Sequence, residues 1–227
     1  MHRARLLFIV LLLVVFFQRC TPSKLQMSSG RKVDEISNLL ILQPFAQIGL
    51  ISRGNKPEPD ISLSNKAIKE IEFQVKNLVP RHIRVSQLYT LKGKDSLIQS
   101  AINAIVNQVE RAKDIRFIDI PETLLHVLDS TKHDYCLGIA EVGFARSEEN
   151  YNKQYDKGSM TQFVTLGMYG FVPYKSSSTM VCFIVDRKNN NIAFYGRDTW
   201  KETNPNERIV IKAHLDDLIT KYFMGAK

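Results

Sequence analysis

The sequence predicts an α/β (α+β) fold with a single mixed β-sheet flanked by helices, a C-terminal β-hairpin and a closing helix. Two patterns lead to this prediction. In the first half of the chain, short apolar runs typical of strands alternate with longer stretches whose apolar residues recur at helical spacing. In the second half, two apolar runs flank the polar, asparagine-rich stretch 186–191, which is typical of a hairpin turn.

The first nineteen residues predict an export signal that is not part of the fold. A basic start with Arg3 and Arg5 is followed by twelve apolar residues at 6–17, and the chain then turns polar. A spanning helix needs about 20 apolar residues, so this run is short for one. We therefore expect residues 1–19 to be a signal peptide.

Cys20 stands where a lipoprotein signal places its acylated cysteine, directly after the apolar run. Arg19 departs from the usual small residue before that cysteine, so cleavage at another site and an uncleaved signal anchor stay open. Lipidation, including palmitate, would attach the chain firmly to a membrane because stable anchoring takes more than one acyl chain. The sequence thus predicts an outer-membrane lipoprotein of the bacterial cell envelope that faces the periplasm.

Residues 20–37 are polar, contain Pro22 and Gly30, and show no periodicity. This composition is typical of a flexible tether. We expect the folded domain to occupy residues 38–227.

The first half of that domain reads as alternating strands and helices. Residues 38–45 are an apolar run closed by Pro44, which predicts a strand buried on both faces, and residues 53–62 predict a loop. Ser64 is a candidate N-cap for a helix that ends before Pro80. A strand at residues 83–88 follows.

The middle of the chain continues this alternation. The pattern predicts a helix over 95–113, an edge strand at 115–118, a helix from Pro121 to about residue 131, and a long strand over 133–144. The central strands are expected to bury Leu40, Leu42, Leu137, Ile139, Phe183 and Val185.

Residues 147–160 are polar and predict an excursion from the sheet, and the apolar segment 163–172 that follows has two interpretations. It is either a core strand or an exposed patch, and exposed apolar patches mark interaction sites. The candidate residues for contact with a partner or a membrane are Phe163, Leu166, Met168, Tyr169 and Phe171. A hairpin over 179–195 and a closing helix over about 206–223 complete the chain.

The sequence shows no recognisable catalytic, metal-binding or cofactor-binding motif. Cys136 and Cys182 lie within apolar runs and predict small buried side chains, with a disulfide open if their strands are neighbours. Glu141 interrupts an apolar strand and is interpreted as an acid facing solvent. His126 and His133 lack the further ligands that a metal needs. We therefore expect no enzymatic activity.

The charge distribution does not favour nucleic-acid binding. The formal net charge is +8, and removal of residues 1–19 takes away three arginines and no acid, which leaves +5. The remaining positive and negative charges are interspersed, whereas nucleic-acid binding calls for a stripe of one sign.

Three stretches resemble a group of envelope proteins. Residues 39–45 resemble the opening strand of the lipoproteins related to the curli-secretion channel, of the penicillin-binding-protein activator lipoproteins and of the N-terminal domain of the Tol-system propeller protein. Residues 124–142, with Asp134-Tyr135-Cys136-Leu137-Gly138, resemble their helix and following strand. Residues 181–195 resemble their hairpin. Asn189-Asn190-Asn191 stands where these proteins often have glycine, and asparagine can replace glycine there because it tolerates the left-handed backbone conformation.

The resemblance implies a non-enzymatic accessory or binding component in envelope assembly or secretion, with an envelope protein as partner. The alternative is an oligomeric pore-forming or secretion-channel subunit that uses the excursion at 147–178, and homo-oligomers are compatible with either. Fold similarity transfers no function by itself.

Overall fold

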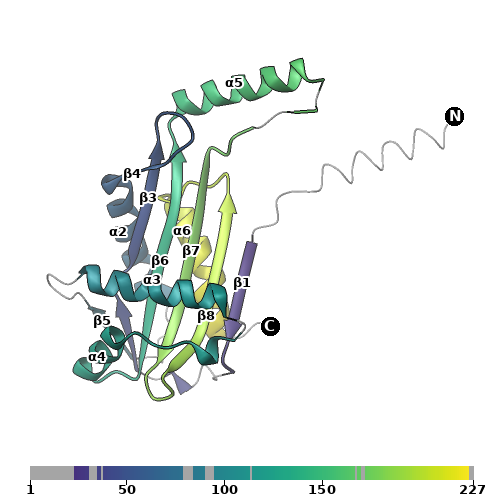
Figure 1. Ribbon diagram of the computed structural model, residues 1–227. Helices are drawn as coiled ribbons and strands as arrows, with labels where there is room; N and C mark the ends of the chain where they lie inside the picture. Colours follow the sequence, from purple (N-terminus) through teal and green to yellow (C-terminus); the bar gives the residue numbers. More distant parts are fainter. Residues whose placement is uncertain are drawn as a thin grey trace, which may run out of the picture.

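The computed structural model describes residues 23–30, 35–36, 38–78, 84–89, 95–112, 114–166, 168–169 and 172–224. Cys20 and the signal peptide therefore lie outside the described residues. An eight-stranded sheet has the order β1-β8-β7-β6-β2-β5, and β3 also pairs with β6 and with the short β4. Figure 1 shows α3 and α4 on one side of the sheet and α2 and α6 on the other. The fold is mixed α/β, as predicted.

The strands are β1 (Ser23–Ser28), β2 (Asn38–Leu42), β3 (Phe45–Ile51), β4 (Glu58–Pro59), β5 (Arg84–Tyr89), β6 (Tyr135–Arg146), β7 (Ser176–Asp186) and β8 (Asn191–Lys201). The helices are α2 (Ile61–Leu78), α3 (Asp95–Arg111), α4 (Glu122–Thr131), α5 (Glu148–Val164), α6 (Arg208–Leu215) and α7 (Lys221–Met224). A 3₁₀ turn, η2 (Ile115–Phe117), precedes α4, and a π-helical turn, η3 (Asp216–Thr220), joins α6 to α7.

The sheet is organised around β6. One edge of β6 pairs in parallel with β2 near Cys136 and then with β3 from Ala140 to Arg146. Its other edge pairs with β7 in antiparallel fashion over eleven residues. The interruption between β2 and β3 falls at Gln43 and Pro44, and proline cannot donate a backbone hydrogen bond to a ladder. The predicted strand at 38–45 is therefore the first of two strands that together follow β6.

The two faces of the sheet carry separate apolar cores, as the alternation of side chains along a strand requires. One core packs β-strand residues such as Leu137 and Ile139 against α2, α6, η3 and α7. The other packs Leu40, Leu42 and Phe183 against α3, η2 and α4. All six residues predicted for the central strands are buried, which confirms the predicted core.

Cys136 and Cys182 are both free and buried. They lie on adjacent strands, but Cys136 is opposite Val185 and Cys182 is opposite Ile139, and the two thiols belong to different cores. Opposite faces keep them apart, so the disulfide that the sequence left open does not form. Burial raises the pKa of the Cys136 thiol to about 12.

The predicted tether is corrected in part, because residues 23–28 form β1 at the edge of the sheet. Each residue from Ser23 to Ser28 pairs with β8. The Gln26 side chain also donates to the carbonyl of Asp217 in η3 (3.2 Å). Residues 23–28 thus belong to the folded domain, which the sequence predicted to start at residue 38.

Two local predictions were wrong for reasons of hydrogen bonding. Asp60, and not Ser64, caps α2, since its carboxylate accepts from the Leu63 amide (2.9 Å). Ser64 instead accepts from the Ile48 amide (3.0 Å) and fastens α2 to β3. The predicted edge strand at 115–118 is η2, whose first turn is capped by the side chain of Asp114.

The largest difference concerns residues 147–172. The predicted polar loop is the helix α5, which extends to Val164, and the described residues of the segment 163–172 are exposed and form no core strand. Ser147 accepts from the Asn150 amide as N-cap, and Glu148 and Glu149 occupy the first turn, where acidic side chains are favourable. Figure 1 shows that α5 lies beyond the edge of the sheet where β6 ends and β7 begins.

We predict that Leu137→Ala lowers the free energy of unfolding by ~2–5 kcal/mol, because it opens a cavity in a fully buried strand. Chemical denaturation measures this change. The matched control is Val142→Ala on the same strand, where half of the side chain is exposed and a small loss is expected. Equal losses for the two variants would contradict the position of Leu137 in the core.

Candidate functional site

The first candidate site is a group of exposed apolar side chains at and beyond the C-terminal end of α5. Phe163 is 82% exposed and Leu166 is 91% exposed. We call the group the apolar tip; it consists of Met160, Phe163, Val164, Leu166, Met168, Tyr169 and Val172. Such a concentration of exposed apolar surface is typical of an interaction site.

The base of α5 is fixed to the sheet by Arg146, the last residue of β6. Its guanidinium donates to the carbonyl of Gly54 (3.0 Å), the side chain of Asn55 (3.1 Å) and the carbonyl of Tyr174 (3.3 Å), and it also donates to Asn150 of α5. Burial lowers the pKa of Arg146. The cation therefore joins the β3–β4 loop, α5 and the segment leading to β7.

The tip itself is shaped by a turn around Thr165. The Thr165 hydroxyl contacts the carbonyls of Thr161 (2.7 Å) and Tyr169 (2.7 Å) and accepts from the Tyr169 amide (3.0 Å). Leu166 follows with a φ of 50°, a left-handed conformation that ends the helix. These contacts turn the chain and leave the side chain of Leu166 in solvent.

Tyrosines and lysines surround the base of α5. Lys175 Nζ lies 5.9 Å from the ring centroid of Tyr151, and Lys201 Nζ lies 4.7 Å from that of Tyr174. Tyr151 and Tyr155 lie close to each other on α5, with ring centroids 6.0 Å apart. The base of α5 thus carries aromatic rings with cations beside them, at the opposite end of the helix from the apolar tip.

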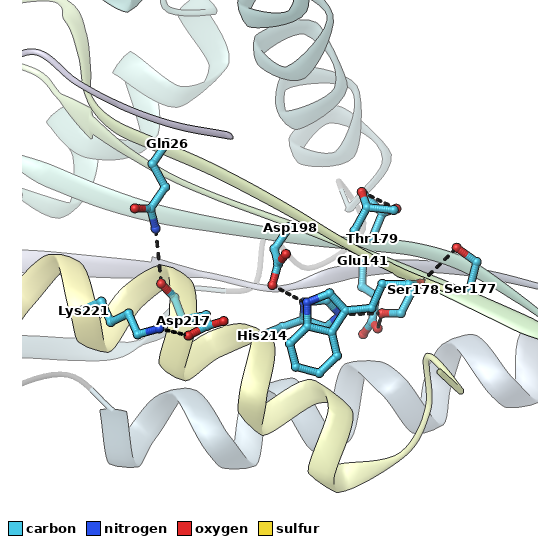
Figure 2. A network of polar contacts seen from close by, with 11 residues as sticks. Gln26, Glu141, Ser177, Ser178, Thr179, Asp198, His214, Asp217 and Lys221 are labelled. Carbon is cyan, nitrogen blue, oxygen red and sulfur yellow. Dashed lines mark hydrogen bonds and ion pairs between the residues drawn. The ribbon is translucent and has the colours of Figure 1, made fainter. Parts of the chain in front are cut away.

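A second cluster is buried between the sheet and α6 (Figure 2). Ser178 Oγ of β7 lies 2.8 Å from Glu141 Oε1 of β6 and 3.0 Å from His214 Nε2 of α6. His214 Nδ1 in turn lies 3.0 Å from Asp198 Oδ2 of β8. The Trp200 ring packs on the imidazole at a centroid distance of 4.4 Å.

Burial decides the protonation of this cluster. It raises the pKa of Glu141 to about 8, although the bond from Ser178 acts in the opposite direction. It also lowers the pKa of His214, with Asp198 opposing the shift. At neutral pH the carboxyl and the imidazole are therefore uncharged, and the Nδ1–H donates to Asp198. The Ser178 hydroxyl can then donate its hydrogen bond to His214 Nε2, while the protonated Glu141 carboxyl donates to Ser178 Oγ.

The order Ser178, His214, Asp198 has the hydrogen-bonding pattern of a serine-hydrolase triad. A nucleophile must be reached by its substrate, however, and the side chains of Ser178, His214 and Glu141 have no exposed surface. As it stands the cluster is a buried polar network that joins three strands to a helix, because buried polar groups are tolerated when they are hydrogen-bonded.

The predicted site residues have different outcomes. Phe163, Leu166, Met168 and Tyr169 lie together at the apolar tip, whereas Phe171 lies outside the described residues. The interpretation of Glu141 as a solvent-facing acid was wrong, since its carboxyl is buried against Ser178 of β7, which also contacts His214 of α6. An acid within an apolar strand was the available sequence signal.

The described part of the chain lacks two other kinds of site. No group of three or more His, Cys, Asp and Glu residues there could hold a metal ion. No helix among the described residues is long and apolar enough to cross a membrane.

No protein-family model matches this chain, and no curated protein matches it. Solved structures similar to it include the PelC dodecamer from Paraburkholderia phytofirmans, with 8% identity, a TM-score of 0.40, and coverage of 89% of this chain and 97% of that one. A DUF4136 family protein from Bacteroides thetaiotaomicron has 10% identity and a TM-score of 0.35, with coverage of 92% of this chain and 100% of that one. Likenesses this distant assign no function.

We predict that the free energy of unfolding falls as pH rises from 6.5 to 8, by up to about 1.4 kcal/mol per pH unit. The folded chain keeps the Glu141 proton up to pH about 8, whereas the unfolded chain releases it near 4.5, so unfolding releases a proton in this range. His214, with its lowered pKa, acts in the opposite direction, and its effect fades as pH rises through its ordinary value of 6.5.

Urea denaturation at several pH values measures this slope. Glu141→Gln keeps a hydrogen-bonding side chain of the same length but cannot ionise, so it should lose the fall in stability, and its slope should be close to zero toward pH 8, where His214 no longer contributes. A Gln variant with the parent's slope would show that another group causes the dependence.

Proposed function

We propose that this chain is a lipid-anchored protein of the bacterial cell envelope that catalyses nothing and acts as an accessory or binding component in envelope assembly or secretion. The observation that carries the proposal is the apolar tip, which holds seven large apolar side chains in contact with solvent. Monomeric soluble proteins rarely expose such a patch unless it meets another surface. The export signal and Cys20 support the envelope location.

The absence of catalysis is also a proposal. It is supported by the burial of Ser178, the one described serine that we find in a triad-like arrangement, and of the acid and imidazole beside it. It is supported further by the buried, protonated thiol of Cys136, because a nucleophilic cysteine needs a lowered pKa.

The lipid anchor is tested with Cys20→Ala. We expect the variant to lose incorporation of labelled palmitate and to be released from membranes by a carbonate wash that the parent chain resists. Fractionation and electrophoretic mobility report both effects. A variant that resists the wash with unchanged mobility would indicate an uncleaved signal anchor and refute the lipoprotein proposal.

The binding surface is tested with Leu166→Asp. Leu166 lies in solvent, so the free energy of unfolding of the variant should differ from that of the parent by no more than about 0.5 kcal/mol, as for other surface substitutions. In the Cys20→Ala background it should lose co-sedimentation with native envelope membranes. Phe117→Asp is the control, since Phe117 is also highly exposed but lies in η2. Unfolding by Leu166→Asp, or equal co-sedimentation of both variants, would contradict the proposal.

A further inference from the structure

The strand register brings the start of β1 and the base of α5 to the same edge of the sheet, namely the edge formed by the strand ends where β6 finishes and β7 begins. Ser23 is opposite Thr199 of β8, Thr199 is opposite Thr179 of β7, and Thr179 is opposite Val142 of β6. This row lies a few residues from the point where β6 ends and β7 begins, which is where α5 leaves the sheet. Figure 1 shows β1 running along the sheet with its N-terminal end toward α5.

The distance from Cys20 to this edge is limited by covalent geometry. Cys20 is three residues before Ser23, and a chain spans at most ~3.3–3.6 Å per residue, so the two Cα atoms are at most about 11 Å apart. All six residues of β1 are paired with β8. A lipid on Cys20 would therefore hold this edge of the sheet close to the membrane.

The chemistry of the apolar tip fits a lipid surface. Residues 158–174 contain no Asp, Glu, Lys or Arg, so the tip offers no ion pair to a charged protein surface. Tyr151 and Tyr174, with the ammonium groups of Lys175 and Lys201 above their rings, lie nearer the sheet. Tyrosine is enriched at the headgroup level of membranes, and apolar side chains enter the boundary between headgroups and acyl chains.

We propose that the apolar tip inserts into the same leaflet that carries the lipid of Cys20. This inference rests on the proposed lipid anchor and names the membrane as the surface that the tip contacts. The domain then has two attachments at one edge of the sheet, an acyl anchor beside β1 and the apolar tip beyond α5. Two attachments fix the orientation of the domain, which a single flexible tether could not do.

The test uses the full chain with its native Cys20, produced in a bacterium, purified in mild detergent and reconstituted into vesicles of phosphatidylethanolamine and phosphatidylglycerol. The introduced thiol of the Phe163→Cys variant is labelled with a fluorophore whose emission shifts to the blue in an apolar environment. Part of the lipid carries bromine on its acyl chains, which quenches a fluorophore that enters the bilayer. The buried Cys136 and Cys182 are protected from labelling. Met168→Cys is a second position in the tip, so the result does not depend on one variant.

Phe117→Cys is the matched control. Phe117 and Phe163 are each 82% exposed. The neighbours of Phe117 in η2, Ile115 and Arg116, line a cavity together with Met27 and Ser28, which places the control at the other end of β1.

We expect a blue shift and quenching by brominated lipid at positions 163 and 168, at least threefold stronger than at position 117. Adding Leu166→Asp to the Phe163→Cys chain should reduce the quenching without releasing the chain from carbonate-washed vesicles. Emission at 163 and 168 equal to that at 117 in an anchored chain would overturn the inference and leave the anchor intact.

A blue shift without quenching would show that a second copy of the chain covers the tip, and it would also overturn the inference. Failure of the proposed anchor has a separate signature, because the parent chain and the Cys20→Ala variant would then behave equally in carbonate, either both released or both retained.

Discussion

The rest of the structure depends on the position of β6. This strand is paired along both of its edges, and its first half is buried on both faces. The strand joins the parallel part of the sheet, through β2 and β3, to the antiparallel part, through β7. Gly138 allows this packing, because a Cβ atom there would lie 2.2 Å from Cζ of Phe183. The same strand places Glu141 in the buried network and Arg146 at the base of α5. An error in its register would move both, since a shift of one residue exchanges the faces of a strand.

The molecule departs from the usual distribution of polar and apolar groups in two places near the same edge of the sheet. An acid, a serine and a histidine are buried, which is tolerable because they bond to one another. Large apolar side chains are exposed at the tip of α5, where none of the sheet's cores is within reach. The network joins β6, β7 and β8 to α6 and so stiffens the sheet beside the point where α5 leaves it.

The edge strand β1 connects these features to the proposed anchor. A flexible tether of eighteen residues would allow the domain to take any orientation to the membrane, whereas pairing from Ser23 onward leaves a connection of three residues. The pairing also covers an edge of β8 that would otherwise expose backbone groups. The same hydrogen bonds thus protect the sheet edge and, with the proposed anchor, would orient the domain.

The sequence by itself determined the fold class, the hairpin and the strands buried on both faces, because periodicity and turn residues act over short distances and are written in neighbouring positions. It also marked the apolar segment at 163–172, although it left open whether that segment was core or surface. Tertiary structure decided the rest. Glu141 is buried because Ser178 bonds to it from a strand 37 positions away, and Ser178 is in turn bonded to His214 on α6; no local pattern encodes that meeting. Residues 23–28 look like a tether in sequence because an edge strand needs few apolar residues and acquires its structure from β8. The apolar tip is exposed because α5 carries it past the edge of the sheet, and only the assembled fold sets where that edge lies.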